Sequence, residues 1–156
     1  MSLVTKAEYR INVIHRAEPE WKSDVERWYQ MDATCFSVNQ AAYQFFQEHR
    51  PNFENLILGI TGGSNLADFD FVNSKCSSPA KFVYTLPNIA LSTVCQMLKW
   101  SGPSSCIICR ENDTNGVISE ALESAKFESR SVLLFITDQL VQDQHLRVLV
   151  QYIGKN

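Results

Sequence analysis

The sequence has no long basic run, no long apolar stretch and no second cysteine pair, and each absence excludes a class of protein. A membrane-spanning helix needs about 20 consecutive apolar residues, and no segment approaches that length. Without a basic run there is no electrostatic basis for binding nucleic acid. The first residues, Met1 to Lys6, lack the apolar core of a secretory signal. We therefore expect a cytoplasmic protein without a membrane or nucleic-acid partner.

The five cysteines are an odd number and do not suggest a disulfide framework. Cys106 and Cys109 are close in sequence, but no second pair completes a four-ligand zinc site. Free thiols buried in a reducing compartment are the expected state. We expect no metal and no cofactor.

The composition is that of a folded soluble protein. Hydrophobic residues make up 45% of the 156 residues, charged residues make up 20%, and the formal net charge is -3. This length fits one domain with one core, so a single domain is expected over residues 1–156.

The spacing of apolar residues predicts strands that alternate with helices. The expected strands cover residues 9–15, 56–60, 105–109 and 131–137, and residues 146–153 could form a strand or a helix, with a strand favoured. The expected helices cover residues 20–30, 37–49 with Ser37 as N-cap, 87–100, and about 114–126. This alternation predicts an α/β fold, a mainly parallel mixed sheet of about five strands with helices on both faces.

Two strand-to-helix corners could carry chemistry, because helix N-termini there present free N–H groups and partial positive charge. The first is Gly59–Ser64, which matches neither a P-loop nor a dinucleotide fingerprint and can be a tight structural turn or a phosphate cradle. The second is Cys109–Asp113, where Cys109 can face inwards or act as a nucleophile. Glu111 at this corner can serve as a general base or only complement the helix dipole. None of the three histidines has a convincing catalytic context.

A series of motifs in the central part of the chain resembles the β-ketoacyl synthases of the thiolase-like superfamily. The motifs are Gly59–Ser64, then Ser78–Phe82, then Asn88 on a helix that ends in Gly102-Pro103-Ser104. Their order and spacing carry the resemblance from Leu56 to Ile136. The sequence of residues 82–88 further resembles that of synthase-like proteins of bacterial aryl-polyene and related pigment pathways. The resemblance implies the N-terminal half of a thiolase-like fold and leaves the first thirty-odd residues outside it.

The sequence departs from this family at the catalytic position. In the family the seventh residue after the serine of Gly-Pro-Ser is the cysteine that accepts the acyl chain, and counting from Ser104 gives Glu111. A carboxylate is a poor nucleophile towards a thioester. The family's two catalytic histidines belong to a C-terminal half that this sequence does not include. A truncated relative without condensing activity is therefore expected.

The resemblance favours an accessory role in fatty-acid or polyketide-type acyl chain synthesis. The expected partner is a second copy, paired through the strand Ser105–Cys109 as the family pairs its nucleophile strand, and an intact ketosynthase or an acyl carrier protein could also bind. One alternative is a residual acyl-thioester enzyme that uses Glu111 or Cys109. Another is a module that binds coenzyme A or a nucleotide, with these ligand-binding residues: Thr61, Gly62, Gly63, Arg110 and Asn112.

Overall fold

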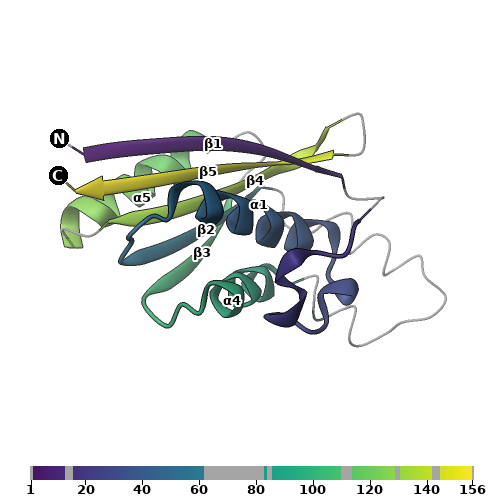
Figure 1. Ribbon diagram of the computed structural model, residues 1–156. Coiled ribbons are helices and arrows are strands. Elements are labelled where there is room, and N and C mark those ends of the chain that lie inside the picture. Colours follow the sequence, from purple (N-terminus) through teal and green to yellow (C-terminus); the bar gives the residue numbers. More distant parts are fainter. Residues whose placement is uncertain are drawn as a thin grey trace.

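The computed structural model describes residues 2–12, 16–61, 83, 86–109, 114–128, 131–141 and 145–155. One sheet contains five strands in the order β1-β5-β4-β2-β3. Their bounds are Ser2–Asn12 for β1, Asn55–Thr61 for β2, Ser104–Cys109 for β3, Val132–Val141 for β4 and His145–Lys155 for β5. The termini of the described chain lie side by side on β1 and β5 (Figure 1).

The sheet is mixed, as predicted, but it is not mainly parallel: two of its pairings are parallel and two are antiparallel. β2 runs parallel to β3 and to β4, whereas β5 runs antiparallel to β4 and to β1. Residues 142–144 alone separate β4 from β5, and so short a connection can join only antiparallel strands. The last segment, for which a strand was favoured over a helix, does form a strand, β5. It runs antiparallel to its neighbour β4.

Helices cover both faces of the sheet. α1 (Ala33–His49) and α4 (Pro87–Leu98) lie on one face, and α5 (Thr114–Glu128) lies on the other. The alternation of side chains along β2 explains this arrangement. Leu58 belongs to the cluster under α1 and α4, whereas its neighbour Ile57 packs against Val117 of α5. None of the helices in the described part of the chain has both the length and the apolar composition needed to cross a bilayer.

The prediction of a helix over residues 20–30 is wrong. This segment forms two short 3₁₀ helices, Glu20–Ser23 and Trp28–Gln30, in which backbone N–H groups bond to carbonyls three residues earlier. Tertiary contacts explain the difference. The Trp21 ring packs against Phe36 at 5.6 Å between centroids, and its Nε1 donates to Gln40 on α1 at 2.9 Å. The apolar spacing correctly marked a buried residue but not the backbone conformation.

α1 begins four residues before the predicted start. Asp32 is its N-cap, because the carboxylate accepts a hydrogen bond from the backbone N–H of Cys35 at 2.6 Å. Ser37 lies within the helix, fully buried, and its Oγ has no hydrogen-bond partner. The helix ends at His49, and its C-cap Arg50 has a left-handed backbone (φ 43°) directly before Pro51. β1 begins earlier than the predicted strand, at Ser2, and residues 13–15 of that prediction lie outside the described residues.

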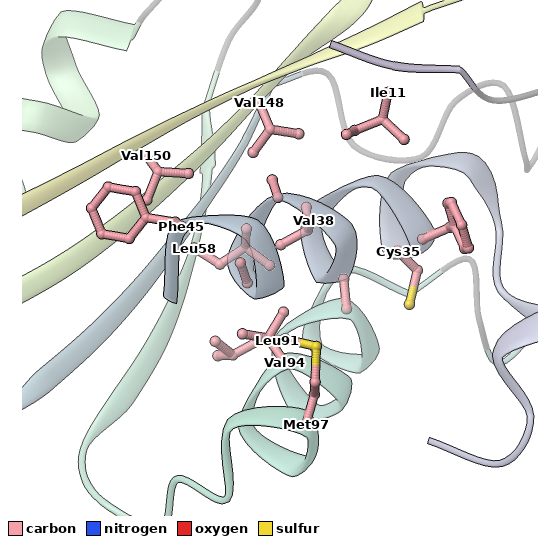
Figure 2. Close-up of a cluster of buried hydrophobic side chains, with 14 of the residues drawn as sticks. Ile11, Cys35, Val38, Phe45, Leu58, Leu91, Val94, Met97, Val148 and Val150 are labelled. Atoms are coloured by element: carbon pink, nitrogen blue, oxygen red, sulfur yellow. The ribbon is translucent and has the colours of Figure 1, made fainter. Parts of the chain in front are cut away.

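The core is built around α1, which packs against β5 on one side and against α4 on the other. In Figure 2 Val148 and Val150 of β5 approach α1 from one side, and Leu91, Val94 and Met97 of α4 approach it from the other. Val38 and Phe45 of α1 are fully buried as a result. Each such side chain contributes about 1.5–3 kcal/mol relative to an exposed one. This packing fixes the position of both helices relative to the sheet.

Candidate functional site

The carboxyl ends of the parallel strands β2 and β3 lie beside each other. Thr61, the last residue of β2, is the register partner of Cys109, the last residue of β3. The two predicted corners follow these residues in the sequence, so both corners start from the same place. α5 begins at Thr114, with four residues between it and the end of β3, and its N-terminal N–H groups lie at the same ends of the strands. The pairing of β2 with β3 thus brings together two corners whose strand ends, Thr61 and Cys109, are 48 residues apart in the sequence.

The predicted site residues themselves are only partly described. Gly62, Gly63, Arg110, Glu111 and Asn112 lie outside the described residues. The backbone of Thr61 and of Cys109 is described at the strand ends, and their side chains are not. The roles assigned to these seven positions therefore stay predictions. Residues 78–82, which carried one motif of the resemblance, also lie outside the described part.

The glycine motif has a packing role at Gly59. A Cβ at this position would lie 2.8 Å from Cγ1 of Val117, which is too close for two carbon atoms. Val117 is 2% exposed and lies in the first turn of α5. The missing side chain lets the start of α5 approach the backbone of β2 at the carboxyl edge. The glycine that opens the first corner therefore positions the helix that follows the second.

A buried polar cluster between α1 and α4 was missed by the sequence analysis. Asn39 donates from Nδ2 to Thr93 Oγ1 at 2.7 Å and to the carbonyl of Cys35 at 2.8 Å. Thr93 Oγ1 donates to the carbonyl of Ala90 at 2.9 Å, and Cys35 Sγ lies 3.3 Å from the same hydroxyl. A hydroxyl has one proton, so the Cys35 thiol must be the donor in that contact. The four-residue spacing of Cys35 and Asn39, which puts both on one apolar helix face, was the sequence signal that could have indicated this cluster.

Cys35 is held as a protonated thiol and is unsuited to nucleophilic chemistry. Burial raises the pKa of the Cys35 thiol to about 12. The thiolate is the reactive form, and this environment suppresses it at neutral pH. The cluster instead links α1 to α4 through polar groups inside an apolar core. Asn39 Oδ1 is buried there without a hydrogen-bond partner.

A shallow open hollow of about 350 Å³ lies between α4 and β3. Cys95 lies in its wall. Burial raises the pKa of this thiol and outweighs a hydrogen bond with Ser104, which lowers it. The other residues that line the hollow are mostly small and polar: Asn88, Leu91, Ser92, Trp100, Ser101 and Gly102. The hollow offers hydrogen bonds and contains no activated thiol. Among the described residues, no group of three metal-ligating side chains comes together.

β3 is an edge strand, which differs from the buried strand predicted from its apolar sequence. Among the described strands it pairs with β2 alone, and Ile108 is 67% exposed. The opposite edge strand, β1, carries exposed charged side chains at Lys6, Glu8 and Arg10, which discourage edge-to-edge pairing. β3 contains no charge and no proline. The two edge strands of the described sheet therefore differ in charge.

Sequence comparison finds no match: no family model matches the chain, and neither does any curated protein. A solved structure is similar in fold, described as a ketosynthase (ApeO) in complex with its chain length factor (ApeC) from Xenorhabdus doucetiae. The TM-score is 0.73 at 11% identity, over 99% of this chain and 79% of that chain. The expected ketosynthase-like α/β fold is thereby confirmed. The likeness in fold also includes the N-terminal residues that the sequence motifs left out.

Proposed function

We propose that this chain is a ketosynthase-like accessory protein that pairs with another chain and does not itself condense acyl groups. Its fold is similar to that of a chain from a complex of a ketosynthase and its chain length factor. The observation that carries the proposal is Glu111 at the position where the motifs of the family place the acyl-accepting cysteine. A carboxylate there would give a labile anhydride instead of a thioester.

The absence of acyl transfer can be tested directly on the intact protein. The chain is incubated with malonyl- and acyl-carrier-protein thioesters, and its mass is then measured. We expect no adduct on the wild-type protein and an acyl adduct on Glu111→Cys, in which a thiol replaces the carboxylate. Cys109→Ala is the control. An adduct on the wild type that disappears in Cys109→Ala would support the residual enzyme instead.

The proposed partner is a second copy of the chain, paired through Ser105–Cys109. Among the described strands β3 pairs with β2 alone, and its exposed Ile108 offers an apolar contact to a partner. Light scattering should give the mass of a dimer at micromolar concentration, and Ile108→Lys should give a monomer. Val4→Lys is the matched control, because Val4 is a 43% exposed apolar residue on the opposite edge. A wild-type monomer would contradict this pairing and leave an intact ketosynthase or a carrier protein as the partner to test.

A ligand-binding role is the second candidate, favoured by the meeting of the Thr61 and Cys109 strand ends near the start of α5. Helix N-termini at such an edge suit phosphate groups. Coenzyme A at 100 times its dissociation constant would add about 2.7 kcal/mol to the free energy of unfolding. Thermal unfolding with coenzyme A and with nucleotides measures this directly. A melting temperature that none of them changes would remove the candidate. A cytoplasmic location belongs with either role, because the free thiols suit a reducing compartment.

A further inference from the structure

The outer face of α4 is polar but carries no charge. From Pro87 to Leu98 the sequence contains no Asp, Glu, Lys or Arg. Its exposed residues Asn88, Ser92 and Gln96 recur at every fourth position and form one stripe along the helix. A helix face in contact with solvent usually carries charged residues, as α5 does at exposed Glu120. The face of α4 is therefore suited to an uncharged hydrogen-bonding partner.

The hollow between α4 and β3 follows this face. Four residues of α4 line it at the spacing of one side of a helix: Asn88, Leu91, Ser92 and Cys95. At a rise of 1.5 Å per residue, they give the hollow a length of about 10 Å along the helix. Its volume of about 350 Å³ is at the lower end of the range of small-molecule sites, about 300–1,000 Å³. The hollow thus has the size for a small molecule.

The aromatic wall of the hollow is held in place by three contacts. The Trp100 ring packs against Phe53, with 4.5 Å between the ring centroids. Its Nε1 donates to the carbonyl of Pro103 at 3.2 Å. A Cβ at Gly102 would lie 2.2 Å from Cζ2 of Trp100, so the glycine makes room for the ring. The hollow therefore has an apolar wall that is already fixed before a ligand binds.

The chemistry of the lining selects a class of ligand. None of the described residues that line the hollow is charged, so an ionic group that left water there would gain no ion pair. Serine hydroxyls and the asparagine amide both donate and accept hydrogen bonds. The hydroxyl groups of a sugar do the same, and the C–H groups of its ring match an apolar wall.

We infer that this hollow binds a neutral monosaccharide. The sugar hydroxyls bond to Asn88, Ser92 and Ser101, and the C–H side of the sugar ring contacts Trp100. The site is separate from the two corners at the carboxyl ends of β2 and β3. The inference goes beyond the proposed function and does not depend on it.

Saturation-transfer NMR on the full chain tests this binding. The probes are glucose, galactose and N-acetylglucosamine at about 10 mM, because a few hydrogen bonds at an open site give millimolar dissociation constants. We expect transfer of magnetisation to the ring protons of at least one of these sugars. Glucose 6-phosphate is the charged counterpart, and transfer to it should be at least about fivefold weaker.

Two exposed positions on α4 provide a matched pair of variants. Ser92→Phe places a ring in the hollow and should weaken binding at least about tenfold, since the ring occupies the space of the sugar. Gln96→Phe is the control, because Gln96 is exposed one turn further along and does not line the hollow. Binding by this control should equal that of the wild type. Both changes are at the surface, and an unchanged melting temperature shows that the fold is kept.

Asn88→Ala should weaken binding about twofold to tenfold, the effect of one lost hydrogen bond. Three results would each overturn the inference. They are no transfer to any of the neutral sugars, equal binding by Ser92→Phe and the wild type, and a preference for glucose 6-phosphate.

Discussion

Replacing Thr93 by valine should destabilise the protein by removing the acceptor at the centre of the polar cluster between α1 and α4. Valine has the shape of threonine, so the change creates no cavity. It leaves the Asn39 Nδ2 proton, which now donates to Thr93 at 2.7 Å, without a partner in a fully buried site. It also removes the contact of the Cys35 thiol with the hydroxyl.

The expected magnitude follows from the cost of a buried unpaired donor, about 1–3 kcal/mol. We expect a loss of about 2 kcal/mol in the free energy of unfolding, since the second Asn39 proton keeps its bond to the Cys35 carbonyl. For a chain of this length, about 2–4 °C of melting temperature corresponds to each kcal/mol. Thr93→Val should therefore melt about 4–8 °C below the wild type.

Urea unfolding followed by tryptophan fluorescence measures this, because Trp21 is buried and becomes exposed on unfolding. The same substitution in an Asn39→Leu background should cost less than half as much, since no amide is then left unpaired. The Asn39→Leu change alone removes a buried carbonyl oxygen that has no partner, so its own cost should be the smaller of the two. A loss below about 0.5 kcal/mol for Thr93→Val, or an equal loss in both backgrounds, would refute the reasoning.

The remaining predictions concern packing, capping and pH. Gly59→Ala should cost about 1–3 kcal/mol by forcing a Cβ against Val117, and Val117→Ala should recover part of that loss in chemical denaturation. Asp32→Ala should cost about 0.5–2 kcal/mol as the loss of a helix cap, whereas Ser37→Ala should cost nothing, and equal losses would contradict the assigned cap. The Cys35 thiol has a folded pKa of about 12 against 9.0, so its stabilisation is complete below pH 9 and is lost as pH rises towards 12. The free energy of unfolding should fall by about 1.4 kcal/mol per pH unit more steeply there than in Cys35→Ala, and parallel pH profiles would exclude the effect.

At the candidate site, sequence motifs predicted the positions of residues along the chain but not which of them lie close together in space. The motifs marked two corners and gave Glu111 a position in a known pattern, but they could not show that the two corners share an edge. That depends on the pairing of β2 with β3, in which Thr61 meets Cys109. The polar cluster of Cys35, Asn39 and Thr93 was missed because its members belong to two helices and come together only when those helices pack.

The sequence by itself determined the local elements and the class of fold. Apolar runs marked β2, β3 and β4, proline and glycine marked where helices end, and ordered motifs indicated a ketosynthase-like fold, because these patterns depend on neighbouring residues. Tertiary structure decided the rest. A connection of three residues turned β5 back along β4, packing on α1 replaced a helix near Trp21 with 3₁₀ turns, and sheet order left apolar β3 at an edge. Each of these depends on contacts between segments far apart in the chain, where the free energy of packing outweighs local preference.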